Sequence, residues 1–371
     1  MTRKQSPDFR SAEVAYVMQC WQAGESCSLV GIGSIGKSNL IHHLADSEIQ
    51  ARHLKELDLA RFRAIVIDPN MLGALPSDAN SDQVRAWAGY ELMMHRLFLA
   101  YYPFEMLGAE DARRFYETYQ ALQDGTNPLY ASMGLRYFEL GLQFFMRNNA
   151  QIVFMFDEFE ELLRQMPVRF FQSLRGLRDA NKNRLSYLAL TRSTLPVLIE
   201  KYKIPPQDIE PFVELFTDNV YYVGPYSDAD ARAMLEDLST RQKLRYPPAL
   251  SDYLFMASGR YAGLLRAAFH SAESINRPTL PALDDQLTAQ LAAKPAVRTE
   301  CRTIWTSLTD AERYVLKAVA RLKSYQVNVE TEQAVTSLVQ KRLLSVNRGE
   351  QRLEIQPPLF RVFVERNLDQ E

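Results

Sequence analysis

The sequence has few cysteines and no long hydrophobic run. Its three cysteines, Cys20, Cys27 and Cys301, form neither a CxxC pair nor a metal-ligand spacing. They therefore fit a reducing compartment and exclude a disulfide framework. No apolar run approaches the roughly 18 residues of a membrane-spanning helix. The stretch before Gly24 also lacks the unbroken apolar core of a signal peptide. These absences predict a cytoplasmic protein with no membrane partner.

The sequence also lacks an excess of charge of one sign. Its 43 Lys and Arg residues against 45 Asp and Glu residues give a formal net charge of -2 at pH 7. This excludes a strongly basic surface, so any nucleic-acid contact must be local. Only 15 glycines and 18 prolines occur among 371 residues, which excludes a collagen-like or low-complexity chain. The length predicts two or three globular domains.

Short apolar runs alternate with helical patterns in the first part of the chain. The runs span residues 28–32, 64–68, 152–157, 185–191 and 219–223. Such alternation predicts a parallel sheet covered by helices on both faces. The continuous run Ile152–Phe156 is typical of a strand buried on both faces. Residues 81–149 are expected to form a helical elaboration, with their many aromatic side chains in the core or, less in keeping with the pattern, in a ligand-binding patch.

After Val223 the strand signals stop and helical patterns follow at residues 227–238, 249–258 and 262–275. They predict a small helical lid domain, residues 226–292. Segment 277–295 carries three prolines and little periodicity, which is typical of a linker. Two further helical patterns, residues 308–322 and 329–340, precede two strand-like runs, residues 343–346 and 352–355, around the turn 347–350. Helices followed by a hairpin predict a winged helix over residues 296–371.

The clearest chemical motif is the octapeptide of residues 31–38, which matches G-x-x-x-x-G-K-[ST] at every fixed position. We call this segment the phosphate loop. An apolar run precedes it and a helical pattern follows. Glycines let the backbone wrap around an anion, and the next helix presents its positive end to phosphate. Lys37 is expected to reach the β- and γ-phosphates, and Ser38 to hold Mg²⁺. The predicted nucleotide-binding residues in this segment are Gly31, Gly33, Ser34, Ile35, Gly36, Lys37, Ser38 and Asn39.

Two carboxylates and an arginine follow buried runs. Asp157 and Glu158 end one run, where an acid of a parallel strand lies beside the phosphate loop. Asp157 is expected to hold the Mg²⁺ water shell and Glu158 to activate the attacking water as a general base. Arg192 ends the next run and can sense the γ-phosphate through a charge-assisted contact. The alternatives are two solvated carboxylates and a surface arginine. The residues assigned to catalysis are thus Lys37, Glu158 and Arg192.

The order of these features resembles a known family. It is similar to the STAND branch of the AAA+-related ATPases, which are signalling switches, and to the related origin-recognition type. The resemblance covers about Phe9 to Glu365 and is carried by Arg10 and Glu13, the phosphate loop, Phe156-Asp157-Glu158, Leu190-Thr191-Arg192, Gly224-Pro225, the helical lid and the winged helix. The implied fold is a three-layer α/β P-loop NTPase core, residues 1–225, followed by the lid and the winged helix.

The resemblance also implies a function. It implies ATP or ADP with Mg²⁺ as cofactors, Arg192 as a first sensor, and Arg266 as a second sensor that reaches the phosphates from the lid. The alternative for Arg266 is a surface position on a helix. The sequence departs from STAND proteins in two places. The element around Phe9–Glu13 is only a partial match, and the segment Gly259–Arg266 lacks the usual Gly-x-Pro proline.

One absence bears on the rate of hydrolysis. Residues 212–219, where motor-type relatives place an arginine finger, contain no basic residue. Such a finger contributes roughly 10³–10⁵ in turnover in related GTPases. We therefore expect slow, regulated ATP hydrolysis and a nucleotide-dependent conformational switch with protein partners or self-association on ATP binding. Arg169 or Arg175 acting on a second molecule is the alternative source of a finger.

The predicted winged helix has a near-balanced charge. From Arg298 to the end of the chain, 12 Lys and Arg residues face 10 Asp and Glu residues. The second helix, residues 329–342, has only Lys341 and Arg342 as basic residues, and both lie at its end. A helix that reads the major groove normally presents basic side chains early. Arg348 and Arg352 can touch phosphate. For the winged helix, protein docking is therefore favoured over DNA binding.

The alternative function for the whole chain is a DNA-associated AAA+ ATPase of the origin-recognition or transposition-regulator type. A scaffold that holds ADP permanently is a third interpretation, which the intact motifs disfavour.

Overall fold

The computed structural model describes residues 5–72, 81–124, 128–274, 285–347 and 352–367. The chain divides into two compact units. Unit 1 comprises Met1–Val30 and Ser38–Tyr221, and unit 2 comprises Gly31–Lys37 and Tyr222–Glu371. The phosphate loop therefore groups with the C-terminal half of the chain. Among the described residues, none of the helices has the length and apolar character needed to cross a membrane.

Unit 1 is built on a five-stranded sheet with the strand order β2-β3-β4-β1-β5. The strands are β1 (Cys27–Val30), β2 (Phe62–Ile67), β3 (Gln151–Phe156), β4 (Leu185–Thr191) and β5 (Val220–Tyr222). The pairs β2–β3, β3–β4 and β1–β4 are parallel. All residues of β1 and β4 are buried, as are the last five of β3. The five predicted apolar runs are confirmed as strands. For β1, β3 and β4 the reason is that strands covered on both faces read as continuous apolar sequence.

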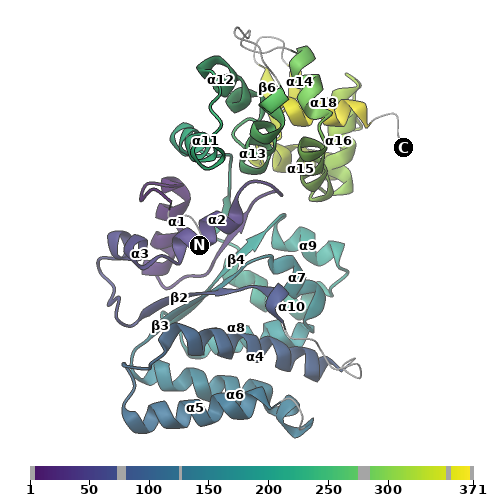
Figure 1. The fold of residues 1–371 in the computed structure, drawn as a ribbon. Coiled ribbons are helices and arrows are strands. Elements are labelled where there is room, and N and C mark those ends of the chain that lie inside the picture. The colour runs from purple at the N-terminus through teal and green to yellow at the C-terminus, as the bar shows by residue number, and fades with distance from the viewer. Residues whose placement is uncertain (1–4, 73–80, 125–127, 275–284, 348–351, 368–371) are drawn as a thin grey trace. The chain divides into compact units, whose positions relative to one another are not determined.

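Helices cover both faces of the sheet (Figure 1). On one face lie α1 (Ser11–Gln22), α2 (Lys37–Leu44) and α3 (Ser47–His53), and on the other α4 (Asp82–Tyr101) and α8 (Val168–Ala180). Unit 1 also contains the helices α7 (Phe159–Gln165), α9 (Leu195–Lys201) and α10 (Pro206–Val213). The fold is thus the predicted three-layer α/β core. On the first face, Trp21 of α1 packs against Phe62 of β2, with ring centroids 5.6 Å apart.

The expected helical elaboration consists of α4, α5 (Ala109–Gln123) and α6 (Pro128–Arg147). Its aromatic residues form the core between these helices, with Phe115, Phe138 and Phe145 fully buried. Phe145 lies 4.3 Å from Tyr101 and 4.8 Å from Phe115, measured between ring centroids. The interpretation of these aromatics as core residues is therefore confirmed for these three side chains.

Unit 2 contains the helices α11 (Asp228–Gln242), α12 (Pro248–Ala257) and α13 (Ala262–Ser271), and then α14 (Asp285–Ala292). The linker predicted over residues 277–295 is wrong for its second half, where α14 forms. Leu287 and Leu291 lie one helical turn apart and are fully buried, and α14 packs against α18 (Pro358–Arg366). Two apolar residues in so short a segment give too weak a periodicity to stand out from the sequence.

The winged helix consists of α15 (Pro295–Thr306), α16 (Asp310–Ala320), α17 (Val329–Gln340), the strands β6 (Leu344–Asn347) and β7 (Arg352–Ile355), and α18. β6 and β7 pair as an antiparallel hairpin, as predicted. The sequence prediction missed α15 and α18, which supply buried apolar residues to this domain. The turn residues Arg348, Gly349 and Glu350 lie outside the described residues, and so does the proposed phosphate contact of Arg348.

A buried ion pair joins two helices of the winged helix. Lys341 Nζ lies 2.6 Å from Glu312 Oε1, and both side chains are only 2% exposed. Glu312 also completes the capping box of α16 with Thr309 and accepts a hydrogen bond from Ser337 Oγ at 2.6 Å. The neighbouring Tyr261 hydroxyl, at the start of α13, donates to the carbonyls of Lys341 and Arg342. Burial raises the pKa of Tyr261 well above its usual range, so this hydroxyl stays protonated.

Candidate nucleotide-binding site

The phosphate loop starts directly after Val30, the last residue of β1, and leads into α2 at Lys37. Two of its residues have left-handed backbone conformations, Gly36 with φ 95° and Ser34 with φ 66°. A glycine is needed at position 36 because a side chain there is strained, and a Cβ would also lie 2.9 Å from the Tyr226 hydroxyl. Ile35, one of the predicted nucleotide-binding residues, has a fully buried side chain, so only its backbone is available to a ligand.

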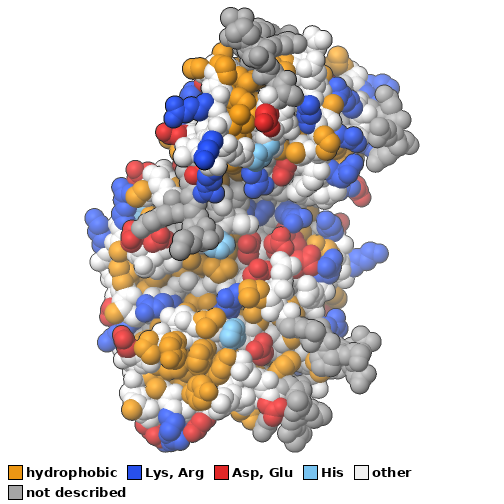
Figure 2. Space-filling view, in the orientation of Figure 1, with side chains coloured by type: hydrophobic (Ala, Val, Ile, Leu, Met, Phe, Trp, Pro, Cys, Tyr) orange, Lys and Arg blue, Asp and Glu red, His pale blue; other side chains and the backbone are white. Residues whose placement is uncertain are grey.

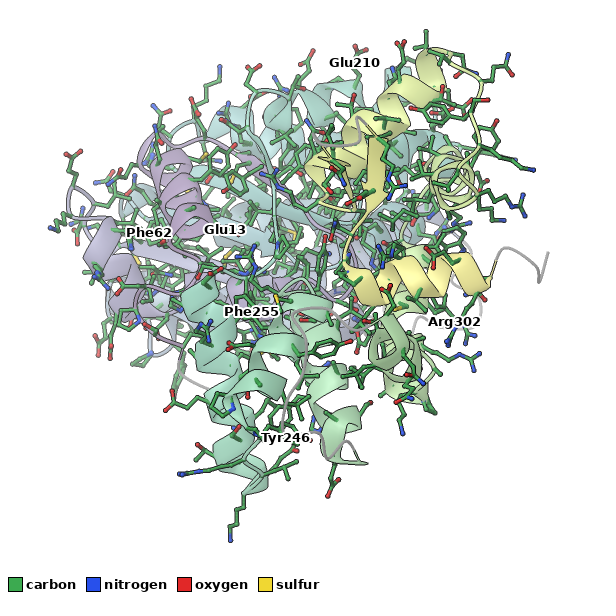
Figure 3. The ribbon with its side chains drawn as sticks, turned by 90° about the horizontal axis from the view of Figure 1, so that it is seen from above. Glu13, Phe62, Glu210, Tyr246, Phe255 and Arg302 are labelled. Carbon is green, nitrogen blue, oxygen red and sulfur yellow. The ribbon has the colours of Figure 1, made fainter. Side chains whose placement is uncertain are left out.

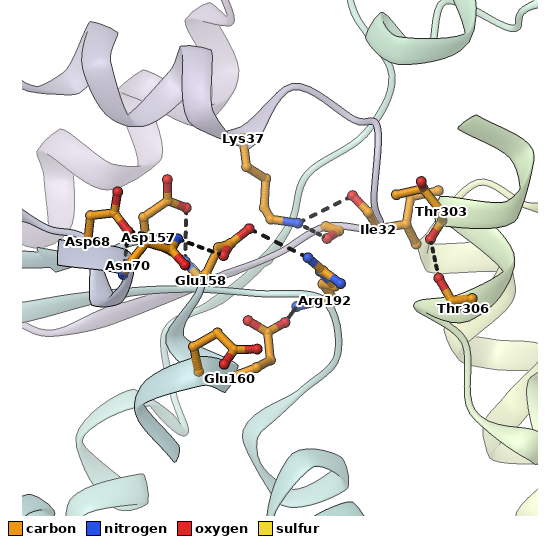
Figure 4. A network of polar contacts seen from close by, with 12 residues as sticks. Ile32, Lys37, Asp68, Asn70, Asp157, Glu158, Glu160, Arg192, Thr303 and Thr306 are labelled. Atoms are coloured by element: carbon orange, nitrogen blue, oxygen red, sulfur yellow. Dashed lines mark hydrogen bonds and ion pairs between the residues drawn. The ribbon is translucent and has the colours of Figure 1, made fainter. Parts of the chain in front are cut away.

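Lys37 folds back over its own loop (Figure 4). Its Nζ donates to the carbonyl of Gly31 and, at 3.3 Å, to the carbonyl of Ile32. An ammonium group held by loop carbonyls is ready to exchange these partners for phosphate oxygens, which carry a full negative charge. The next two predicted ligands, Ser38 and Asn39, are exposed at the start of α2.

Other parts of unit 2 pack closely on the phosphate loop. The amide of Gly263, at the start of α13, donates to the Ser34 carbonyl at 2.8 Å. Ser34 Oγ donates to Glu300 of α15. A Cβ on Gly33 would lie 2.6 Å from the Thr303 methyl group. Gly33 therefore serves the packing of α15 as well as the shape of the loop.

The acid pair lies where the sequence predicts it, directly after β3. The Asp157 amide donates to the Ile67 carbonyl at 3.0 Å, which continues the pairing of β3 with β2. The Asp157 carboxylate accepts the amide of Glu158 at 2.9 Å. Glu158 has a left-handed backbone with φ 42° and forms the N-cap of α7. A left-handed conformation at a non-glycine residue is unfavourable and is typical of functional positions.

Two side chains hold the Glu158 carboxylate from opposite oxygens (Figure 4). Asn70 Nδ2 donates to Oε2 at 3.2 Å, and Arg192 Nη2 lies 3.6 Å from Oε1. Asn70 is itself oriented by Asp68 Oδ1, which accepts its side-chain amide at 3.0 Å. Asn70 is not among the residues predicted from the sequence. The available signal was its position just beyond β2, the neighbour of β3 at the same sheet edge.

Arg192 follows β4, which lies between β3 and β1. Its backbone amide donates to the buried carboxylate of Glu160, a second residue of the site that was not predicted from the sequence. The Arg192 side chain is 43% exposed and pairs only loosely with Glu158. It thus extends from the edge of the sheet and can change partners at small energetic cost.

The remaining predicted arginines are placed as follows. Arg266 lies on α13, and its Nη2 is 3.5 Å from Glu300 Oε1. Of the two candidates for a finger, Arg175 is held by Asp179 at 2.7 Å, whereas Arg169 is exposed. Arg175 must therefore leave an ion pair before it can act on another molecule.

The predicted metal ligands, Ser38 and Asp157, suit Mg²⁺ better than a metal ion that is bound by protein side chains alone. Within the described ranges, no group of three or more His, Cys, Asp or Glu side chains is arranged to hold a metal ion. Mg²⁺ typically takes one or two protein oxygens and completes its shell with water and substrate phosphates. The Ser38 hydroxyl and the Asp157 carboxylate are such oxygens.

The chain resembles known proteins in fold. No protein-family model matches the sequence, and no curated protein matches it either. Among solved structures, the ORC2 protein of Aeropyrum pernix in its ADPNP–ADP complexes matches with a TM-score of 0.51 and 13% identity, covering 97% of this chain and 94% of that chain. A Walker-type ATPase of Pyrococcus abyssi matches with a TM-score of 0.51 and 14% identity, covering 96% and 95%.

The chain shares the fold of these two proteins, in which a parallel α/β sheet is followed by helices and a winged helix. The match extends over the core, the lid and the winged helix, because it covers nearly the full length of both chains. At these identities the likeness concerns the fold. The narrower assignment to the STAND branch stays a prediction, and so do the exact domain boundaries at residues 225, 226–292 and 296.

Proposed function

We propose that this chain is an ATPase that binds ATP with Mg²⁺ and hydrolyses it slowly. The observation that carries the proposal is the arrangement of three parallel strands in unit 1. The register pairs Val30 with Thr191 and Phe156 with Ala189, so β1, β3 and β4 end at one edge of the sheet. The phosphate loop, the acid pair and Arg192 each begin at the next residue. Ligands of open α/β sheets bind at this carboxyl edge.

The proposed roles follow from side-chain chemistry. Lys37 binds the phosphates as a point charge, and Ser38 and Asp157 hold Mg²⁺. The metal, when bound, neutralises charge that develops on the transferred phosphoryl group. Glu158 accepts a proton from the attacking water, and Arg192 contacts the γ-phosphate. Asn70 and Arg192 each contact one oxygen of the Glu158 carboxylate and so orient it. The slow rate is proposed from the absence of a basic residue in residues 212–219, the expected place of an arginine finger.

The proposal is tested by replacing Lys37 with alanine. Hydrogen bonds to charged groups are worth about 1.5–3 kcal/mol, so Lys37→Ala should weaken ATP and ADP affinity by about ten- to hundredfold. Titration with a fluorescent nucleotide measures the change. The exposed Lys55 in unit 1 provides the control, and Lys55→Ala should bind as the unaltered protein does. Equal affinity of Lys37→Ala and the unaltered protein would contradict the assignment of the loop.

A second question is what the ATPase acts on. The fold likeness to the ORC2 protein of Aeropyrum pernix favours the DNA-associated alternative over the signalling switch. The winged helix limits how DNA can be bound. Lys341 is buried against Glu312, and the first turn of α17 carries Glu330 and Glu332. α17 is therefore poorly suited to read bases in the major groove.

Exposed arginines elsewhere on unit 2 can contact phosphates instead. Arg302 extends from α15 into solvent (Figure 3), and Arg342 and Arg352 are exposed near the hairpin. Figure 2 shows basic side chains scattered among acidic ones over the drawn face of unit 2. We infer weak, sequence-independent contact with the DNA backbone.

This inference predicts that duplex DNA binds at low salt and is released as salt rises. Each phosphate contact adds about -0.9 to the slope of log affinity against log salt. Fluorescence anisotropy with a labelled duplex measures the affinity and its dependence on salt. The double substitution Arg342→Ala and Arg352→Ala should make the slope shallower, whereas Arg169→Ala in unit 1 should leave it unchanged. If no duplex DNA binds at low salt, the proposed DNA contact is refuted, and a switch that docks protein partners becomes the favoured function.

A further inference from the structure

Glu300 places a carboxylate against the phosphate loop. It lies on α15 and is 21% exposed. Its Oε2 accepts the hydroxyl of Ser34, the residue at the centre of the loop. Its Oε1 lies 3.5 Å from Nη2 of Arg266, the arginine that the sequence predicts as a second phosphate sensor. The Glu300 carboxylate therefore contacts two side chains, Ser34 and Arg266, that are predicted to contact the nucleotide.

The contact is supported by backbone packing and does not depend on one flexible side chain. The Gly263 amide binds the Ser34 carbonyl at 2.8 Å. A Cβ on Gly263 would lie 2.6 Å from the Ser34 Cβ and would also meet Glu300. A Cβ on Gly33 would lie 2.9 Å from the Thr303 carbonyl. Glycines at 33 and 263 therefore permit the loop, α13 and α15 to approach within van der Waals contact.

A carboxylate and a phosphate compete for such a position. The loop offers N–H donors and Lys37, which attract any anion. Two anions in the same site repel one another strongly when they are partly removed from water. Nucleotide phosphates held by this loop and the Glu300 carboxylate therefore disfavour each other.

We propose that Glu300 is a built-in competitor of the nucleotide phosphates, so that nucleotide binding and the release of α15 from the loop are coupled. The proposal rests on the ATPase function proposed above. Because coupling between two sites is reciprocal, nucleotide binding loosens α15, and any partner that holds α15 away from the loop raises nucleotide affinity by the same factor. The position of α15, the first helix of the winged helix, then depends on whether the phosphate loop holds a nucleotide.

The test uses the full chain and removes only the charge. Glu300→Gln keeps the side-chain length and an oxygen that can accept the Ser34 hydroxyl. It should raise the affinity for Mg²⁺–ADP and Mg²⁺–ATP by about tenfold, within the usual range of coupling between sites. The control is Glu332→Gln, which makes the same charge change at an exposed position of α17 and should leave affinity unchanged. Fluorescent nucleotide titration gives both values.

The outcomes separate this proposal from the ATPase assignment. If unaltered protein and Glu300→Gln bind with equal affinity, while Lys37→Ala binds less, the ATPase assignment holds and the competition fails. If neither protein binds nucleotide, the ATPase assignment fails and this proposal with it. If Glu300→Gln lowers affinity, Glu300 supports the site and does not compete.

Discussion

Glu158→Gln should slow ATP hydrolysis by about 10²–10⁴-fold while ATP still binds, because a positioned general base contributes an effect of that size. Glutamine has the same shape and can still accept the Asn70 amide, but it cannot take a proton from water. The Asn70 contact at 3.2 Å should therefore persist, and the fold should not change. Bound ATP should accumulate, so the variant also offers a way to hold the chain in its ATP state.

Single-turnover hydrolysis of labelled ATP measures the chemical step directly, and nucleotide titration confirms that binding is retained. Glu200→Gln provides the matched control, since Glu200 is exposed at the end of α9. It should hydrolyse ATP as the unaltered protein does. Hydrolysis by Glu158→Gln at an undiminished rate would show that another group activates the water and that Glu158 has a structural role.

Lys341→Ala should destabilise the winged helix by about 3–5 kcal/mol, because it leaves the Glu312 carboxylate buried without its ionic partner. Both side chains are 2% exposed, so water cannot replace the lost contact. Glu312 would keep the Ser337 hydroxyl and its capping contact with Thr309. These neutral donors offset only part of the cost of burying a charge.

Native-state hydrogen exchange of the amides of α16 and α17 measures this loss locally, independently of the stability of unit 1. Lys323→Ala is the control, since Lys323 is exposed beyond α16. The double substitution Lys341→Met and Glu312→Leu should recover much of the loss, because replacing both charges leaves none unpaired. Unchanged exchange in Lys341→Ala would mean that Glu312 reaches water in solution.

The pair also shows what the sequence leaves open about the basic residues of this helix. Lys341 and Arg342 are neighbours at its end, and the sequence alone does not distinguish their surroundings. In the structure one is buried and the other is exposed. Helical periodicity places a side chain on a face, but which face is covered depends on α16, which packs there.

The same distinction applies to the missed helix α14. Its buried residues Leu287 and Leu291 become significant only because α18, more than 60 residues later in the chain, provides the surface that covers them. Local propensity was too weak to predict the helix, and tertiary packing supplied the stabilisation. By contrast, β4 spans Leu185–Thr191 as predicted, because its apolar run is complete in itself.

The sequence alone determined the phosphate loop, the acid pair and the strands that carry them. Each depends on consecutive residues, and a run of neighbours fixes both local conformation and chemistry. Only the tertiary structure decided what these groups touch. Asn70 meets Glu158 across 88 residues, and Ser34 meets Glu300 across 266. Contacts of such separation depend on how whole elements pack, and no local pattern in the sequence records them.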